Sequence, residues 1–409
     1  MKDLTCRSNR HPVFSADGQQ IAFSPTLRVN DLSAIAILDL VTKKTRIVET
    51  PFQRIREIAF HPTDKSLYVL AYKLGGTHQI WNISYPDGNV TRVTSDGDAY
   101  RSLSLSADGT KISANRLQMH SHLWVLPKGD ISRQRQLTFG ENEISGLNSL
   151  QFDPENNLLF TTRRNGSEGT WITDVEGKNQ RKFGKDKNVG GQPEYAFAAK
   201  RNKLFFRDYD EIWAVNSDGS DARKVDLGPA KSYQQPAVSP DEKWLYYTER
   251  DKDQALIWRR SLETNVKEIV LVPQDYSPEH FLSVSPDGKY LAFLYESKNT
   301  KGSEETASER IRRFGFLNLD SKSHKIIELH ASGPMIRWTN GGKSFDYTVF
   351  TNKGSAIFRK NIDKYTEAEL ILEIKDDVIF NFDWSENGED LAIGRGKAVT
   401  NVVVLAPAE

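Results

Sequence analysis

Two short stretches of the chain contain residue types that perform chemistry in other proteins. His120-Ser121-His122 places two imidazoles two residues apart, which puts both on one face of a β-strand, as a metal site requires. No third ligand can be placed beside them from the sequence. Histidines that pack or face solvent are therefore the favoured interpretation, and we predict neither a bound metal nor any other cofactor.

The second stretch, Gly341-Gly342-Lys343-Ser344, ends like a phosphate-binding loop. That motif needs a glycine five residues before Gly342, where this chain has Arg337. The stretch is better explained as a tight turn, so nucleotide binding is not predicted. The chain also lacks the G-x-S-x-G nucleophile elbow of α/β-hydrolases. We therefore assign no catalytic residue from the sequence.

Composition excludes several classes of partner. The 409 residues include 55 basic and 55 acidic side chains, and this balance argues against a nucleic-acid partner, which needs a basic surface. No apolar run approaches the roughly 18 residues of a membrane-spanning helix. The single cysteine, Cys6, excludes an internal disulfide. The opening MKDLTCRSNR has no apolar core of a signal peptide, so we expect a cytoplasmic protein or part of a longer one.

A recurring sequence phrase predicts the strands and turns that must position any functional residue. SADGQQIAF (15–23), SADGTKISA (106–114), SPDEKWLYY (239–247) and SPDGKYLAF (285–293) are near-copies of one another. Aligned on this turn, nine copies follow at steps of 46, 45, 47, 45, 41, 46, 54 and 46 residues. A step near 45 residues is the period of a four-stranded propeller blade.

Two columns of apolar residues support the alignment. The position three residues before the turn aspartate holds Phe14, Phe60, Leu105, Phe152, Phe197, Val238, Val284, Trp338 and Trp384. The position four residues after it holds Ile21, Leu67, Ile112, Leu159, Leu204, Leu245, Leu291, Phe345 and Leu391. A third column contains Trp81, Trp124, Trp171, Trp213 and Trp258, which we interpret as packing between sheets. Each phrase is thus a hairpin, with Asp287 and Gly288 supplying its turn chemistry in the seventh copy.

These patterns predict an all-β fold: a single β-propeller of about nine four-stranded blades, with eight as the alternative. Residues 1–409 would form one domain. The ninth repeat supplies only three strands, so an N-terminal strand within residues 1–10 is expected to pair with the last blade, 378–409. Such pairing closes the ring and leaves no free sheet edge between blades.

The repeated phrases resemble the TolB-type, WD-like β-propeller repeat of bacterial proteins. The segment EIWAVNSDGS (211–220) is also similar to that family, and the resemblance spans essentially the whole chain. The closing segment FNFDWSENGEDLAIGRGKAVTNVVVL (380–405) resembles the ends of propellers found behind winged-helix or protein-kinase modules in multidomain bacterial regulators. The resemblance implies an extracytoplasmic, periplasmic location, and it implies little about activity because propellers host many functions.

In propellers, the loops that lead into the innermost strands surround one mouth of the central channel. Mixed charge with tyrosine in these loops suits recognition of a protein or a small polar ligand. A solvated rim without a ligand is the alternative interpretation. The candidate ligand-binding residues at this rim are Arg10, Arg54, Tyr100, Arg101, Glu143, Glu194, Tyr233, His280 and Arg337.

Two functions therefore remain open from the sequence. The first is a non-catalytic propeller that binds or scaffolds, as the sensing or protein-interaction part of a bacterial regulator. The second is a propeller enzyme, such as a lyase, lactonase or hydrolase, with its catalytic groups in the channel. The first is favoured because no catalytic motif is present, and we expect a monomer.

Overall fold

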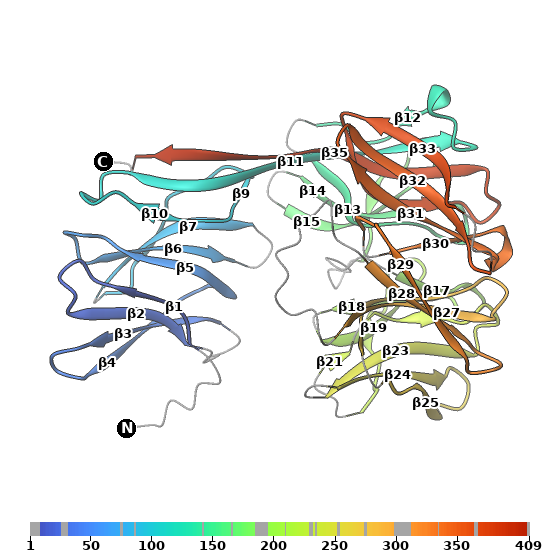
Figure 1. The fold of residues 1–409 in the computed structure, drawn as a ribbon, viewed down its shortest axis with the longest axis horizontal. Coiled ribbons are helices and arrows are strands. Elements are labelled where there is room, and N and C mark those ends of the chain that lie inside the picture. The colour runs from blue at the N-terminus through green and yellow to red at the C-terminus, as the bar shows by residue number, and fades with distance from the viewer. Residues whose placement is uncertain are drawn as a thin grey trace. The chain divides into compact units, whose positions relative to one another are not determined.

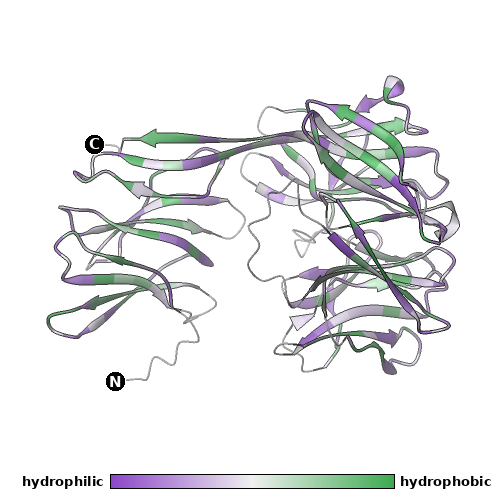
Figure 2. Cartoon of the chain, viewed as in Figure 1, coloured by the Kyte–Doolittle hydropathy of each residue, from purple (hydrophilic) through white to green (hydrophobic). Residues whose placement is uncertain are grey.

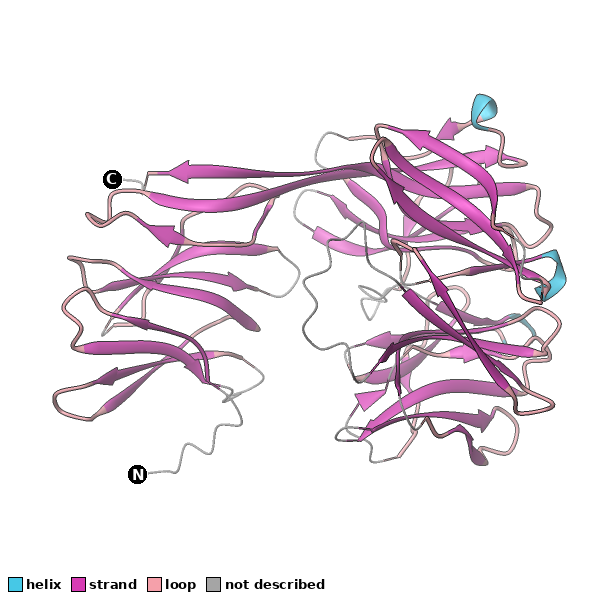
Figure 3. Ribbon diagram, viewed as in Figure 1, coloured by secondary structure: helices cyan, strands magenta, loops and turns pink. Residues whose placement is uncertain are grey.

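The fold described here is a computed structural model of the 409-residue chain (Figure 1). It describes all residues except 1–8, 26–31, 74–76, 86, 141–142, 165–166, 185–194, 209, 229–231, 234, 252–253, 274–275, 298–311, 334, 364–366 and 407–409. Nearly all of its regular structure is β-strand, with three short 3₁₀ turns at Ile131–Arg133, Ala199–Arg201 and Asn340–Gly342 (Figure 3). The all-β prediction is confirmed. No helix in the described part of the chain is long and apolar enough to cross a membrane.

The chain divides into two compact units. Unit 1 contains Met1–Met119, Arg164–Glu168 and Ala398–Glu409, and unit 2 contains His120–Arg163 and Gly169–Lys397. We number the sheets 1 to 9 after the sequence repeats that build them.

Unit 1 holds three sheets. Sheet 1 has the order β1 (Asn9–Phe14), β2 (Gln20–Pro25), β3 (Ala34–Asp39), β4 (Thr45–Glu49). Sheet 2 has the order β5 (Arg54–Phe60), β6 (Ser66–Tyr72), β7 (His78–Ser84), β8 (Val90–Arg92). Sheet 3 consists of β9 (Ala99–Tyr100), β10 (Ser104–Leu105), the first half of β11 (Ile112–Pro127) and the second half of β35 (Asp390–Leu405).

Unit 2 holds the other sheets. Sheet 4 has the strands β13 (Ile144–Phe152), β14 (Leu158–Arg164), β15 (Ser167–Thr173) and β16 (Arg181–Lys182). Sheet 5 has the strands β17 (Tyr195–Ala198), β18 (Lys203–Asp208), β19 (Glu211–Asn216) and β20 (Arg223–Lys224). Sheet 6 has the strands β21 (Ser232–Tyr233), β22 (Ala237–Val238), β23 (Trp244–Asp251), β24 (Gln254–Ser261) and β25 (Lys267–Leu271). Sheet 7 has the strands β26 (Tyr276–Val284), β27 (Tyr290–Ser297), β28 (Arg312–Asn318) and β29 (His324–Leu329). Sheet 8 is β30 (Arg337–Thr339), β31 (Ser344–Thr351), β32 (Gly354–Asn361), β33 (Glu369–Lys375). Sheet 9 is β34 (Val378–Trp384), the first half of β35, the second half of β11, and β12 (Arg135–Gln136).

The predicted turn chemistry is confirmed in the hairpins that open the repeats. In the seventh repeat, the Ser285 hydroxyl donates to Asp287 Oδ1 at 2.6 Å, and the same oxygen accepts the Lys289 amide at 3.1 Å. Gly288 takes a φ of 72°, which a residue with a Cβ adopts only at a cost. The same hydroxyl and amide contacts recur around Asp17, Asp108 and Asp241.

Two strands depart from the repeat because they are twice the usual length. β11 and β35 have 16 residues each, and each contributes one half to sheet 3 and the other half to sheet 9. Repeat 3 has no glycine or proline between Ile112 and Trp124, so nothing in that stretch ends the strand. Sheet 9 is therefore a composite of residues from repeats 3 and 9.

The described strands of sheet 9 are arranged differently from the predicted closure by residues 1–10. β35 has β34 on one side and β11 on the other, and β12 pairs with β11, so β11 and β12 are the third and fourth strands of sheet 9. Asn9 and Arg10 pair with Pro25 and Ser24 of sheet 1. Residues 1–8 lie outside the described residues. The expected count of nine sheets around one axis is not confirmed.

Neighbouring sheets of unit 2 share apolar clusters in a cyclic order. Buried residues of sheet 4 pack on sheet 5, those of sheet 5 on sheet 6, and so on until sheet 9 packs back on sheet 4. Representative fully buried residues of these clusters, from the 4–5 pair to the 9–4 pair, are Phe206, Leu245, Phe293, Phe345, Phe382 and Leu150. Both faces of every sheet in unit 2 are thus covered within the unit.

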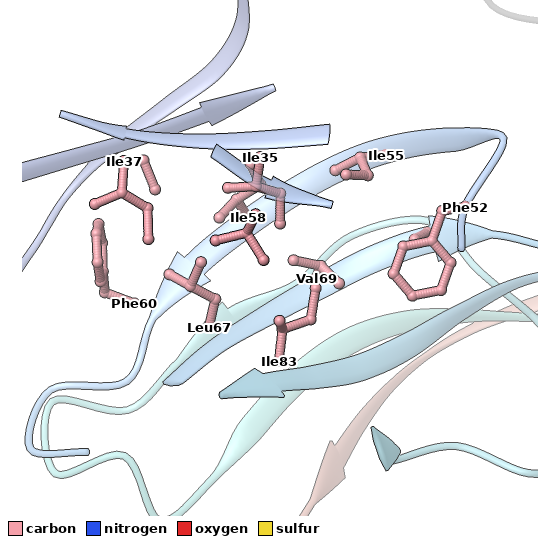
Figure 4. Close-up of a cluster of buried hydrophobic side chains, with 12 residues drawn as sticks. Ile35, Ile37, Phe52, Ile55, Ile58, Phe60, Leu67, Val69 and Ile83 are labelled. Atoms are coloured by element: carbon pink, nitrogen blue, oxygen red, sulfur yellow. The ribbon is translucent and has the colours of Figure 1, made fainter. Parts of the chain in front are cut away.

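Unit 1 has two such clusters for its three sheets. The first packs Ile35 and Ile37 of sheet 1 against Ile58 and Leu67 of sheet 2 (Figure 4). The second packs sheet 2 against sheet 3, with Leu70 and Ile112 both fully buried. The far faces of sheets 1 and 3 belong to neither of the clusters formed by the described residues of unit 1.

Candidate functional site

A cavity of about 930 Å³ lies where the innermost strands of unit 2 converge. Each of the six sheets of the unit contributes to its lining. The contributing residues include Gln151 (β13), Phe197 (β17), Val238 (β22), Val284 (β26), Arg337 (β30) and Asp383 (β34). Residues of the hairpin turns, among them Pro286, Gly341 and Glu386, line it as well. The cavity therefore lies at the ends of the innermost strands that lead into the hairpins.

One apolar column of the repeat supplies much of the cavity wall. Five of its nine members line the cavity: Phe197, Val238, Val284, Trp338 and Trp384. They recur there because the position three residues before the turn always falls at the same end of the innermost strand. The sequence analysis used this column only to support the alignment of the repeats.

Arg337 is the best-connected side chain in the wall. It is 8% exposed, and its Nε lies 2.9 Å from Asp383 Oδ1 and donates to the Phe382 carbonyl at 2.9 Å. Its Nη2 donates to the Leu150 carbonyl at 3.3 Å. Asp383 in turn accepts the Phe152 amide at 2.8 Å. One arginine from sheet 8 thereby joins sheets 9 and 4.

The electrostatics of Asp383 follow from this burial. Loss of water raises the pKa of the carboxyl above its usual range, and the Arg337 guanidinium and backbone amides offset part of that rise. A buried carboxylate is stable only when it is paired and hydrogen-bonded, and Asp383 is both.

A second ion pair stands beside the first. Asp346 is fully buried and accepts two hydrogen bonds from Arg359, at 2.8 and 2.9 Å. The indole Nε1 of Trp384 donates to the same carboxylate at 2.9 Å, and the Arg359 guanidinium lies 5.9 Å from the Trp384 ring centroid. Burial raises the pKa of Asp346, while Arg359 counteracts that rise. Arg359 and Trp384 both line the cavity, so their hydrogen bonds to Asp346 hold one side of the cavity wall in place.

Two lining residues carry polar atoms that remain unsatisfied. Trp338 Nε1 and Thr339 Oγ1 are buried and have no hydrogen-bond partner in the described part of the chain. Buried polar atoms usually find a partner. These two have almost no accessible surface, so the wall would have to shift slightly for them to reach a ligand in the cavity. At the mouth, Lys128 Nζ lies 3.5 Å from Glu389 Oε2.

The predicted rim residues are divided between the two units. Arg10, Arg54 and Arg101 are exposed residues of unit 1. Tyr100, also in unit 1, is 1% exposed and donates to Asp96 at 2.7 Å, and burial raises the pKa of its hydroxyl. Glu194 lies outside the described residues.

The remaining rim candidates belong to unit 2. Glu143 is buried and accepts a hydrogen bond from the Ser145 hydroxyl. Tyr233 is buried, and its hydroxyl donates to the Gly228 carbonyl at 2.9 Å. His280 lies within β26. Among the candidates whose side chains the structure describes, Arg337 alone lines the cavity described above.

The other chemical motifs have structural explanations. Gly341 and Gly342 take positive φ values of 62° and 89° in the turn between β30 and β31, as predicted for a hairpin. His120 and His122 lie in the continuous strand β11. Among the described residues, no group of three or more His, Cys, Asp or Glu side chains could hold a metal ion.

No protein-family model and no curated protein matches this chain. Solved structures with similar folds include TolB from Acinetobacter baumannii, at 10% identity and a TM-score of 0.42, covering 94% of this chain and 82% of that one. A nidogen/laminin complex matches at 15% identity and a TM-score of 0.43, covering 61% and 93%. An oligogalacturonate lyase in complex with manganese matches at 14% identity and a TM-score of 0.32, covering 90% of each chain. Identities and TM-scores this low assign neither a ligand nor an activity.

Proposed function

We propose that unit 2 is a closed six-blade β-propeller that binds a polar ligand or peptide segment in its cavity. In this proposal it is the non-catalytic sensing or interaction part of a bacterial regulator, acting outside the cytoplasm as the repeat resemblance implies. The observation that carries the proposal is the convergence of all six innermost strands on one cavity of about 930 Å³. Cavities of roughly 300–1,000 Å³ are typical of ligand sites.

The charges of the cavity favour binding over catalysis. Asp383, which lines the cavity, and the fully buried Asp346 are each held by an arginine at 2.8–2.9 Å, so both carboxylates serve as fixed parts of the structure. A general base must instead reach a substrate proton. The wall contains the Trp384 indole, and the unsatisfied polar atoms of Trp338 and Thr339 lie in lining residues, where a small shift of the wall would bring them to the cavity. These groups suit a ligand with an apolar part and hydrogen-bonding groups.

The test fills the cavity without touching the ion pairs. Ser283, a half-buried residue of β26, lines the cavity, and Ser283→Arg places a long side chain into it. The matched control is Ser321→Arg, at an exposed turn of the same sheet. A panel of amino acids, organic acids, sugars, nucleosides and extended tetrapeptides is screened by thermal shift, and hits are measured by calorimetry.

We expect at least one class to bind the wild type and the Ser321→Arg control, with affinity reduced at least tenfold in Ser283→Arg. A hit that binds Ser283→Arg equally well would place its site elsewhere. Conversion of a panel compound by the wild type, lost in Asp383→Asn, would favour the alternative of a propeller enzyme.

A further inference from the structure

Sheets 3 and 9 differ from the other sheets because each combines strands of two repeats. In the described part of the chain, each of the other seven sheets takes its strands from a single repeat. Sheet 3 takes its third strand from repeat 9, as the second half of β35. Sheet 9 takes its third and fourth strands from repeat 3, as the second half of β11 and β12. Repeats 3 and 9 have therefore exchanged their outer strands with each other.

The exchange depends on close pairing between β11 and β35, which are neighbouring strands (Figure 1). In sheet 9, the Lys128 amide donates to the Glu389 carbonyl at 2.6 Å. In sheet 3, the Asn401 side-chain amide donates to Gln118 Oε1 at 3.4 Å. Between these contacts, a Cβ on Gly396 would overlap the carbonyl oxygen of His120 in β11. The exchanged pairing therefore requires a residue without a side chain at position 396.

The register of the other repeats shows which strand repeat 3 would hold without the exchange. In four of them, the residue six positions after the turn residue pairs with the aromatic residue of the third strand. These pairs are Val69 with Trp81, Phe206 with Trp213, Tyr247 with Trp258, and Tyr347 with Phe358. In repeat 3, the same register would place Ala114 opposite Trp124 and Arg116 opposite His122, in a hairpin that turns at residues 118–120. Repeat 3 thus contains a third strand of its own.

The second half of β35 suits either sheet. Val403 and Leu405 pack on the cluster between sheets 2 and 3, and Val402 and Val404 alternate with them, so both faces of this strand are apolar (Figure 2). A third strand between two sheets needs such a pattern. The second half of β11 shows the same property in sheet 9, where one side packs towards sheet 4 and the other towards sheet 8.

We propose that repeats 3 and 9 alternate between two arrangements. One is the exchanged arrangement of this structure. In the other, the unexchanged arrangement, each repeat folds its third strand back onto its own second strand, so that every repeat forms its own sheet, as the sequence pattern predicts. Two ladders between β11 and β35 are then replaced by one ladder within each, so the number of ladders is the same. The arrangements differ mainly by two turns, at residues 118–120 and 396–398, and exchange of equivalent elements at such turns costs little.

The exchange decides whether the sheets of unit 2 close. Leu123 and Val125 of β11 belong to the cluster that joins sheet 9 to sheet 4, together with Leu150 and Phe152. In the unexchanged arrangement these β11 residues leave sheet 9, and the series of six sheets loses that closing contact. One consequence rests on the proposed function: a ligand bound in the cavity of closed unit 2 stabilises the exchanged arrangement, because it binds that arrangement alone.

Two engineered cysteine pairs in the full chain report the two arrangements, in a background in which Cys6→Ser removes the single native cysteine. Gln118→Cys/Asn401→Cys reports the exchanged arrangement, in which these side chains touch. Arg116→Cys/His122→Cys reports the unexchanged one. Six positions along the continuous strand β11 span about 20 Å, whereas a disulfide needs Cα atoms within about 7 Å. In the unexchanged hairpin, the same two residues would lie opposite each other at about 5 Å.

Each protein is refolded from urea, oxidised with a short pulse of diamide, and mapped by peptide mass spectrometry of the monomeric fraction. We expect both pairs to cross-link, each in part of the chains. Gly396→Ala adds a Cβ that overlaps β11 in the exchanged arrangement, so the ratio of the Gln118–Asn401 yield to the Arg116–His122 yield should fall about tenfold. The control Gly97→Ala, whose Cβ meets nothing within 4 Å, should leave that ratio unchanged.

A second variant covers the case in which Gly396→Ala fails to fold. Met119→Gly adds no atoms, and it places a residue that turns readily in the unexchanged hairpin. It should therefore lower the same ratio.

Two results would overturn the proposal. In the first, the wild-type background and Met119→Gly both give only the Gln118–Asn401 cross-link, which would mean that the exchange is permanent. In the second, only the Arg116–His122 cross-link forms, which would mean that the exchanged arrangement is not populated. A compound that binds the cavity should raise the Gln118–Asn401 yield, and an unchanged yield would contradict the coupling. A cavity that binds no compound would count against the proposed function alone, since the yields without ligand test the exchange.

Discussion

Unit 1 and unit 2 are built from one repeat, yet their sheets close differently. In unit 2, each of the six sheets shares apolar clusters with the next in a cycle, so both faces of every sheet pack on a neighbour in its described residues. In unit 1, three sheets share two clusters, and the far faces of sheets 1 and 3 belong to neither cluster of the described residues. The hairpin turns and apolar columns are the same in both. The repeat therefore specifies a sheet and its contact with the next sheet, whereas closure depends on residues outside the repeat pattern.

Two such features occur at the closure of unit 2. The first is β11, which runs on from sheet 3 and supplies the third strand of sheet 9. The second is the pair of Arg337 and Asp383, which joins sheets 8, 9 and 4 across sequence separations of up to 231 residues. No corresponding buried pair joins sheets 1, 2 and 3 in the described part of unit 1. The predictions below test whether these features account for the difference.

The largest effect is expected from Arg337→Met. It leaves the Asp383 carboxylate buried without its cation, which costs about 3–5 kcal/mol of unfolding free energy in comparable pairs. Urea denaturation followed by hydrogen exchange should show the loss in peptides of unit 2 and unchanged protection in sheets 1 and 2. The double variant Arg337→Met/Asp383→Leu removes the orphaned charge as well and should regain most of the stability. Equal losses in the two units would show that the pair does not act on closure.

A smaller effect is expected from Gly315→Ala in β28. Its Cβ would collide with the ring of Phe293, a fully buried residue of the cluster between sheets 6 and 7. Overpacking of this kind costs about 1–3 kcal/mol. The control is Gly97→Ala in unit 1, where a Cβ meets nothing within 4 Å. Thermal unfolding should show a lower melting temperature for Gly315→Ala and not for the control. An unchanged melting temperature would mean that the contact between sheets 6 and 7 has room for the added methyl group.

Much of the fold could be predicted from the sequence because its signals are local. The turn at Asp287 and the apolar column from Phe14 to Trp384 depend on neighbours within a few residues, and both were interpreted correctly as hairpins. The division into two units could not be predicted this way. It follows from β11 continuing past Leu117, and the one available signal was the lack of a glycine or proline between Ile112 and Trp124.

The sequence and the structure point to different candidate sites for a related reason. The sequence analysis placed the site at the loops entering the innermost strands, whereas the cavity lies at the hairpin ends of those strands. Among the candidates with described side chains, only Arg337 belongs to both sites. The pairing of Asp383 with Arg337 and of Asp346 with Arg359 depends on which sheets are neighbours in space, and spacing along the chain does not give that. Trp338 and Trp384 were in the predicted apolar column, but their second role at a cavity wall needs the closed order of the sheets.

The smallest effect compares equivalent turns of the two units. In unit 1, the Ser106 hydroxyl and the Thr110 amide hold the pKa of Asp108 down at about 2. In unit 2, Asn387 accepts the equivalent bonds from Ser385 at 2.8 Å and Glu389 at 3.0 Å without titrating. A carboxyl whose folded pKa is depressed stabilises the fold above its unfolded pKa near 4, and that contribution is lost as the pH falls towards 2.

The Asp108→Asn variant should therefore have a melting temperature close to that of the wild type at pH 7. Between pH 5 and pH 2, its melting temperature should fall less than that of the wild type. The control Asp320→Asn, in the β28–β29 turn, reports the effect of removing one exposed charge. If the Asp108→Asn curve runs parallel to the wild type over that range, the turn carboxylates do not set the acid sensitivity of unit 1. The presence of Asn387 in unit 2, where the equivalent turn of unit 1 has Asp108, would then need another explanation.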